Sequence, residues 1–339
     1  MGEFDDSRLD DPDALAAGDD VLRPLAEAGA RLRREAAAAD PVLGALAREG
    51  RPRAVIAIGP EARLLRAVLE PTCPVPFVAW PNLGLPGWVG PLDVVVVLGG
   101  QGMQPLDCVH EALRRGSRLV VTARPDSELA GRSASRVTTL LPSTTTDPLC
   151  RAVTALMALH GLGLAAYTDP IAIADALDAV ASDCSYARDI AANPAKTLAL
   201  ELADAQPLIW GGSVLAARAS RRIAEALRSA SGRMALAADA TELIPLLADT
   251  LPRDPFADPF DADVPEPRPT LVVIEDGLGD AASDEARDIL ENNARAAEVR
   301  VSHLEHTTDA DIVRYATVLQ KGRFAAAYLG VGMGRSGAL

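Results

Sequence analysis

The chain has 339 residues, 49% of them hydrophobic, and a formal net charge of −14. This length is typical of two domains, each with enough apolar residues for its own core. The acidity argues against nucleic acid and anionic membrane surfaces as partners, because like charges repel. The four cysteines stand far apart, which favours buried, reduced thiols over disulfides or a metal site. An acidic N-terminus and the lack of a bilayer-length apolar stretch predict a cytoplasmic protein.

The first half of the chain alternates apolar runs with helical patterns. A leading helical region over 19–48 comes first. The expected strands are Ala54–Ile58, Val75–Val78, Asp93–Leu98, Arg118–Thr122 and Val137–Leu141, with helices over 61–69, 105–115 and 128–134 between them. Asp93–Leu98 is apolar on both faces, as a central parallel strand covered by helices must be. The alternation predicts a doubly wound parallel sheet of roughly five strands.

The second half repeats this α/β plan after two bridging helices. The first of them starts at Asp147-Pro148 and the second lies near 171–182. The expected elements that follow are a helix after Pro194, a strand over 207–210, an amphipathic helix over 214–230, segments 234–238 and 242–247, a strand over 270–275, a helix over 284–297, a strand over 298–305 and closing helices over 309–331. Segment 251–269 is rich in proline and acidic residues and is expected to be a mobile, exposed loop. We therefore predict two α-β-α sandwich domains, 1–165 and 166–339.

Three apolar strands stop at glycine just before a helical pattern begins. The turns are Gly59, then Gly99-Gly100-Gln101-Gly102, and then Gly211-Gly212-Ser213. A strand–glycine–helix junction bares backbone N–H groups at the positive end of a helix, which suits phosphate or carboxylate. We take these residues as candidate ligand-binding residues. Gly211–Ser213 is the best of them because it keeps a hydroxyl, whereas tight strand–helix packing is the alternative explanation for the glycines around Gln101.

Other side chains are weaker candidates. Thr144 and Thr145 could hold an oxyanion, although capping of the next helix by Thr146 or Asp147 is the favoured interpretation. Glu61 and Glu242 are possible catalytic carboxylates, but each also suits the first turn of a helix.

Two basic residue types are expected on the surface. Lys196 is interpreted as an exposed helix residue next to Pro194. His303 and His306 could bind a metal with Glu305 between them, but alternation along a strand points them to opposite faces. No metal and no cofactor is expected.

Several motifs together indicate a family. The block from Pro74 to Ala130 contains Leu85-Pro86-Gly87-Trp88-Val89, an apolar strand, the glycine turn, a helix ending at Arg115-Gly116, and Glu128-Leu129-Ala130. On these residues the chain resembles the first sugar-isomerase (SIS) domain of bifunctional phosphoglucose/phosphomannose isomerases, in a divergent actinobacterial form. The second half is similar to that family's C-terminal domain, through Asn193-Pro194-Ala195-Lys196 and the helix over 324–329. The resemblance implies two SIS domains, a sugar-phosphate ligand, and a homodimer.

The sequence departs from the family's pattern at the positions of the family's phosphate-binding and catalytic residues. The family's phosphate loop is rich in Ser and Thr, whereas Leu98–Met103 contains no hydroxyl, and Glu61 stands in the turn where the family has Gly-Gly-Ser. The family's catalytic Glu would map to 230–233 and its ring-opening His to 239–242, and neither residue type is kept there under that alignment. Three functions remain possible. The chain is an isomerase that converts glucose or mannose 6-phosphate to fructose 6-phosphate, a catalytically silent sugar-phosphate-binding or regulatory protein, or a structural partner of sugar-activating enzymes.

Overall fold

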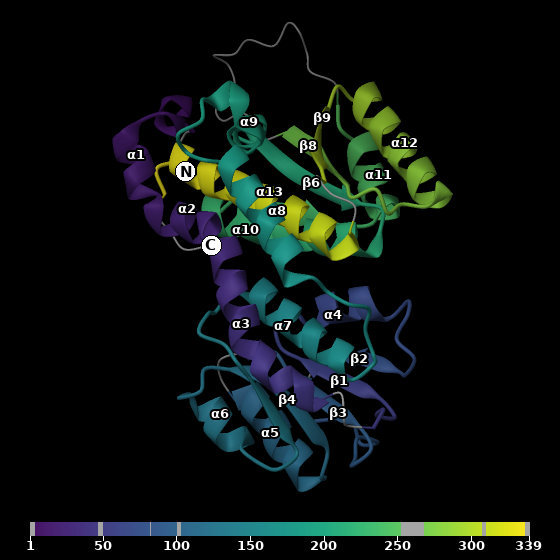
Figure 1. The fold of residues 1–339 in the computed structure, drawn as a ribbon. Helices are drawn as coiled ribbons and strands as arrows, with labels where there is room; N and C mark the ends of the chain where they lie inside the picture. The colour runs from purple at the N-terminus through teal and green to yellow at the C-terminus, as the bar shows by residue number, and fades with distance from the viewer. Residues whose placement is uncertain are drawn as a thin grey trace, which may run out of the picture. The chain divides into compact units, whose positions relative to one another are not determined.

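The fold was obtained as a computed structural model and consists of two units (Figure 1). The structure describes residues 4–46, 50–81, 83–99, 103–251, 268–306 and 310–335. Contacts divide the chain into a first unit, residues 29–174, and a second unit, residues 1–28 with 175–339. The leading residues therefore belong with the C-terminal half, where the Asp5 N–H donates to the Gly332 carbonyl. Most of the segment expected to be a loop, 252–267, lies outside the described residues, and Arg268 and Pro269 begin a strand.

The first unit is a five-stranded parallel sheet with helices on both faces, as predicted. Its strands are β1 (Val55–Ile58), β2 (Phe77–Ala79), β3 (Val94–Val97), β4 (Arg118–Ala123) and β5 (Thr138–Pro142), in the order β2-β1-β3-β4-β5. Its helices are α3 (Ala28–Leu46), α4 (Ala62–Leu69), α5 (Met103–Arg114), α6 (Glu128–Ser133) and α7 (Pro148–Gly161). Strands β1 and β3 are buried along their whole length, because helices cover both of their faces.

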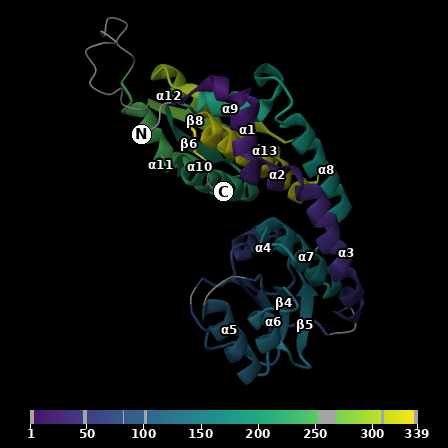
Figure 2. The same cartoon turned by 90° about the vertical axis from the view of Figure 1, so that its left-hand side faces the viewer.

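Alternate residues of the central strands face different helices. Ile56, Ile58, Val95 and Val97 form one core cluster with α5 and α6. Helices α4 and α7, which contact one another, lie on the other face (Figure 2). This two-sided burial is the physical reason that the strands read as unbroken apolar runs.

The second unit holds a four-stranded parallel sheet in the order β7-β6-β8-β9. The strands are β6 (Ala205–Gly211), β7 (Leu236–Ala237), β8 (Arg268–Glu275) and β9 (Arg300–Glu305). The helices are α1 (Pro12–Ala17), α2 (Asp19–Ala26), α8 (Pro170–Asp183, which begins in the first unit), α9 (Pro194–Glu201), α10 (Val214–Ser231), α11 (Ala240–Ala248), α12 (Ala281–Ala296) and α13 (Asp311–Gly332), with short 3₁₀ turns η1 (Asp6–Leu9) and η2 (Ile190–Ala192). Leu243, Leu247, Leu290 and Ala294 pack α11 and α12 onto one face of this sheet.

Helix α13 is a single central helix where closing helices were expected. Most of its residues are buried, and two of its polar side chains donate to carbonyl groups elsewhere in the unit. The Gln320 side-chain amide donates to the Leu25 carbonyl at 2.6 Å, and the Tyr328 hydroxyl donates to the Cys184 carbonyl at 2.7 Å. Despite the burial of α13, none of the helices in the described ranges combines the length and apolarity needed to cross a membrane.

Lys196 corrects the expectation of an exposed lysine. Its side chain is 0% exposed, and Nζ donates to Asp10 Oδ1 at 2.7 Å and to the carbonyls of Tyr186 and Arg188 at 3.1 and 2.8 Å. Three acceptors match the three N–H donors of the ammonium group, which is what makes its burial tolerable. The surface interpretation was wrong because Asp10, which supplies the carboxylate, is 186 residues away in the sequence, and because the loop before α9 folds back to present its two carbonyls.

The thiols are reduced, but not all four are buried. Cys108, Cys150 and Cys184 are buried, whereas Cys73 is half-buried, so the expectation of four buried thiols was wrong for that residue. Burial raises the pKa of the Cys108 thiol to about 11 and that of Cys184 to about 12. These two groups are therefore protonated and unreactive at neutral pH.

Candidate functional site

The glycine turns of the first unit lie at the point where the strand order of the sheet reverses. Strand β1 sits between β2 and β3, and the ends of β1 and β3 are in register at Ile58 and Val97. Gly59 directly follows β1 and Gly99 lies two residues after the end of β3, with φ of +115° and +68°. Ligands of open α/β sheets bind outside the carboxyl ends of the strands at this switch point. The structure thus brings Gly59 and Gly99 to neighbouring strand ends, whereas Gly100, Gln101 and Gly102 lie outside the described residues.

Arg151 approaches this switch point from α7. A Cβ added to Gly99 would lie only 2.7 Å from Cζ of Arg151, so the guanidinium lies directly against the Gly99 backbone. Within the described residues, its Nε is buried and has no hydrogen-bond partner. Burial lowers the pKa of Arg151, with the charges of Glu35 and Asp147 acting in the opposite direction. The guanidinium stays protonated, since its ordinary pKa lies far above neutrality.

A buried carboxylate accompanies that guanidinium. Glu35 of α3 is 2% exposed, and its Oε1 accepts from the N–H and the hydroxyl of Thr144 at 2.9 and 2.7 Å. Both donors of Thr144 are therefore taken, which leaves it none to offer an oxyanion. The other oxygen, Oε2, is buried without a hydrogen-bond partner in the part of the chain that the structure describes.

Thr145, the other threonine candidate of the first unit, takes part in the N-terminal cap of α7. Asp147 caps α7, since its Oδ1 accepts from the Leu149 N–H at 3.0 Å, and Arg31 donates to its Oδ2 at 3.2 Å. The Thr145 hydroxyl accepts from the Asp147 N–H at 3.0 Å. The favoured capping interpretation of this segment therefore holds for Asp147.

The two carboxylates first considered for catalysis lie in different surroundings. Glu61 is at the N-cap position of α4 and is only 3% exposed, but its side chain makes no capping hydrogen bond. Glu242 is exposed and completes a capping box with Asp239 at the start of α11. Its helix-start interpretation is confirmed, and nothing about its position points to catalysis.

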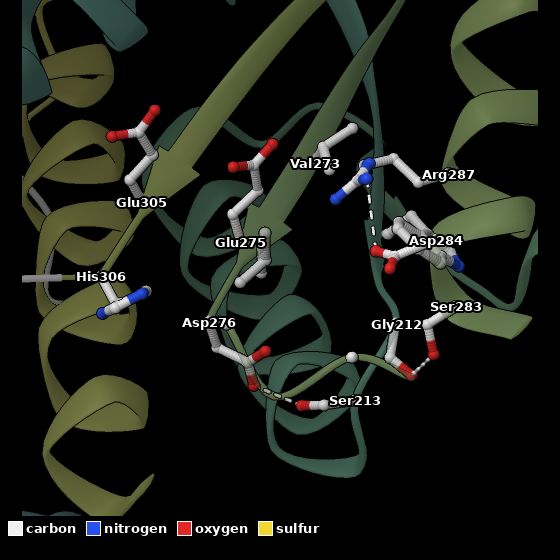
Figure 3. Close-up of a pocket in the computed structure, with 14 residues that line it drawn as sticks. Gly212, Ser213, Val273, Glu275, Asp276, Ser283, Asp284, Arg287, Glu305 and His306 are labelled. Atoms are coloured by element: carbon white, nitrogen blue, oxygen red, sulfur yellow. Dashed lines mark hydrogen bonds and ion pairs between the residues drawn. The ribbon is translucent and has the colours of Figure 1, made fainter. Parts of the chain in front are cut away.

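In the second unit, a cavity of about 540 Å³ opens at the corresponding switch point, between the carboxyl ends of β6 and β8 (Figure 3). Gly212 and Ser213 of the predicted turn line it, together with Glu275 and Asp276 at the end of β8. Further lining residues include Ser283, Asp284, Arg287, Glu305 and His306. In the close-up, Gly212, Ser213 and Asp276 lie together at one side of the cavity, and Glu275 and Glu305 at another.

The hydroxyl of Ser213 is fully engaged. It caps α10 by accepting from the Ala216 N–H at 2.9 Å, and it donates its hydrogen to the Asp276 carboxylate. Asp276 is 3% exposed and also accepts from the Leu278 N–H at 3.1 Å. An internal carboxylate therefore lies at this helix end, where the sequence predicted a bound anion.

The cavity as a whole is acidic. Among the described residues, Glu275, Asp276, Asp284 and Glu305 line it, against one arginine, Arg287. That arginine is itself paired with Asp284 at 3.2 Å. Carboxylates accept hydrogen bonds from hydroxyl groups and bind cations, so this cavity suits sugar hydroxyls or metal ions better than a phosphate.

Gly211 is explained by packing. A Cβ there would lie 2.5 Å from the backbone carbonyl carbon of Ala216 in α10, so only glycine allows β6 and α10 to approach this closely. Gly211 is therefore a packing residue, while Gly212 and Ser213 line the cavity.

Sequence reasoning missed Arg151, Glu35, Asp276 and Arg287, and it considered His306 only as a possible metal ligand. The rule that ligands bind at strand carboxyl ends would have found Asp276, which directly follows β8, and would have placed His306 at the cavity, since it directly follows β9. No local pattern distinguishes Arg151 or Glu35, because their positions depend on how α7 and α3 pack against the sheet.

Comparisons with known proteins agree with this architecture. Residues 191–336 match the family described as bacterial phospho-glucose isomerase C-terminal SIS domain. A comparison with curated protein sequences finds no significant match. The sequence match thus covers the part of the second unit that contains the acidic cavity.

Solved structures share the fold at low identity. Tagatose-6-phosphate ketose/aldose isomerase from Escherichia coli superposes with a TM-score of 0.65 at 12% identity, over 95% of this chain and 94% of that one. The C-terminal domain of glucosamine-fructose-6-phosphate aminotransferase from Francisella tularensis gives 0.61 at 13%, over 93% and 96%. A glucose-6-phosphate isomerase like protein from Thermus thermophilus gives 0.50 at 17%, over 88% and 91%. With two parallel-sheet units and a matching C-terminal region, the chain is an SIS-domain protein that resembles the phosphoglucose isomerase family.

Proposed function

We propose that the chain binds a phosphorylated sugar and that Arg151 holds its phosphate at the Gly99 turn. The observation that carries this proposal is the guanidinium against Gly99, with a buried Nε that has no hydrogen-bond partner in the described residues. Arginine binds phosphate through charge-assisted, often bidentate hydrogen bonds. A single guanidinium here takes over the task that hydroxyl side chains perform in the resembling family.

Thermal melting of the full chain with glucose 6-phosphate or mannose 6-phosphate tests the proposal. Each should raise the melting temperature, while glucose and mannose should not, since a ligand stabilises the folded state that binds it. Arg151→Ala should weaken binding about 10- to 100-fold, as expected for lost charged hydrogen bonds of about 1.5–3 kcal/mol. The matched control is Arg132→Ala, an exposed arginine paired with Glu128 at 3.3 Å. The absence of any shift, or an unchanged shift in Arg151→Ala, would contradict the proposal.

Aldose–ketose isomerisation is the reaction that we propose for the bound sugar. It needs a base that moves a proton between C1 and C2. In the first unit, Glu35 is the candidate base, because its Oε2 is buried and without a hydrogen-bond partner among the described residues. A coupled assay for fructose 6-phosphate should detect turnover, and Glu35→Gln should lower kcat about 10²–10⁴-fold while sugar-phosphate binding is kept.

The second candidate is a silent binding or regulatory protein. It is favoured by the segment 239–242, where the family's ring-opening His would map. Glu242 caps a helix there instead, and the segment contains no histidine. This alternative predicts the melting shift without fructose 6-phosphate formation.

A homodimer and a cytoplasmic location are further proposals from the family resemblance. Light scattering on the purified chain should give twice its mass of 35.4 kDa. A mass equal to one chain would rule out the dimer.

A further inference from the structure

Beside the acidic cavity, three potential metal ligands converge from three elements of the second unit. Glu275 ends β8, His303 lies on β9, and Glu291 lies on α12. One ligand atom of each lies within 4.8 Å of the others. From these residues we propose a binding site for a first-row divalent metal ion such as Mn²⁺, Co²⁺ or Zn²⁺.

The sheet register explains why these side chains meet. His303 lies opposite Val273, and Glu275 lies opposite Glu305, two residues further along both strands. Residues that are two apart on a strand share a face, so Glu275 and His303 project from the same side of the sheet. Val273 belongs to the core cluster with Leu290, which places this side under α12, the helix that carries Glu291.

The interactions at the cluster do not balance the negative charge of its two glutamates. His303 Nδ1 and Glu275 Oε1 share a hydrogen bond of 2.8 Å, with both side chains about one-third exposed, at 38% and 35%. Glu275 has no other ion pair, and Glu291 has neither an ion pair nor a hydrogen bond, within the ranges that the structure describes. Two carboxylates thus lie close together, and among the described residues neither forms an ion pair with an arginine or lysine, an arrangement that a divalent cation stabilises.

The donor set indicates the class of metal. One imidazole nitrogen and two carboxylate oxygens suit Mn²⁺, Co²⁺ and Zn²⁺, whereas Ca²⁺ and Mg²⁺ prefer oxygen ligands throughout. Three protein ligands leave at least one coordination position for water or a ligand group. Because Glu275 also lines the cavity, such a position would be available to a molecule bound there. The cation would offset the excess of carboxylates in the cavity wall.

This proposal is independent of sugar-phosphate binding, and the metal ion alone is the probe. The chelator-treated full chain is titrated with Co²⁺ and followed by visible absorption, and with Mn²⁺ and Zn²⁺ by calorimetry. We expect one equivalent per chain. His303→Ala and Glu291→Gln should each weaken binding by at least about tenfold, since substitution of even an outer-shell partner commonly has an effect of this size.

The control is Glu285→Gln, an exposed glutamate on the same helix but outside the cluster, which should bind metal as the parent chain does. Melting curves without metal show whether each variant is folded. Substoichiometric binding, equal binding by the His303 and Glu291 variants, or an equal loss in Glu285→Gln would overturn the proposal. Because no sugar is present, these outcomes are distinct from any failure of the sugar-phosphate proposal.

Discussion

The two switch points have the same topology and opposite charge. In each unit, a glycine follows the central strand and a helix begins shortly after it. In the first unit Arg151 lies against that turn, whereas in the second Asp276 accepts the hydrogen of Ser213 and further carboxylates surround it. The topology sets where a ligand binds, and side chains from the neighbouring helices and strand ends set which charge it carries.

The glycines at the two points are also required for different reasons. Gly99 has φ of +68°, in the left-handed region that favours glycine. Gly211 has no such backbone, but it lies against the main chain of Ala216. Substitutions at these positions therefore separate a conformational requirement from a packing requirement.

The largest effect is expected from Gly211→Ala. The new Cβ would overlap the carbonyl carbon and oxygen of Ala216, at 2.5 and 2.7 Å, and both are backbone atoms that cannot rotate away. We expect a loss of about 3 kcal/mol in the free energy of unfolding, at the upper end for overpacking. Urea unfolding measures it. Gly330→Ala in α13, where the nearest atom is 3.5 Å away, is the control and should be neutral or stabilising.

A smaller loss of stability, together with a loss of binding, is expected from Gly99→Ala. The positive φ costs about 1–2 kcal/mol for alanine, and the Cβ displaces the guanidinium of Arg151. Gly163→Ala is a close match, with φ of +69° and no atom within 4 Å. Both variants should therefore melt at similarly lowered temperatures. Only Gly99→Ala should abolish the rise in melting temperature that glucose 6-phosphate causes. If Gly99→Ala keeps this rise, Arg151 does not need its present position to bind the sugar phosphate.

Most strands and helices and the two parallel sheets could be predicted from the sequence, but not the packing of residues 1–28 with the C-terminal half. Runs such as Val94–Val97 are short, β-branched and apolar at every position, which is typical of a strand buried on both faces, and their alternation with helical patterns predicted the parallel sheets. The helix start near Glu242 also followed from local pattern, although its N-cap, Asp239, and the capping box were seen only in the structure. These features depend on residues close together in the chain.

The site could be predicted only in part. The glycine turns were located because strand and turn are contiguous, but the charge at each turn comes from elsewhere in the sequence. Arg151 reaches Gly99 from α7, and Asp276 reaches Ser213 from the end of β8. Lys196 was misplaced for the same reason, since its partner Asp10 belongs to the leading segment. Long-range packing decides which polar side chains meet, and a single sequence does not encode it locally.

The smallest difference between a variant and its control is expected for Ser213→Ala, whose control, Ser127→Ala, removes a helix cap that is not next to a buried carboxylate. Ser213 caps α10 and also satisfies the buried Asp276, whereas Ser127 caps α6 with its hydroxyl donating to the Arg124 carbonyl. Loss of a serine cap typically costs about 1 kcal/mol. We expect Ser213→Ala to exceed Ser127→Ala by up to about 1 kcal/mol in urea unfolding, because Asp276 then lacks one buried partner. Equal losses would mean that Asp276 is satisfied by Leu278 alone, and the second switch point would then tolerate its internal carboxylate without the serine.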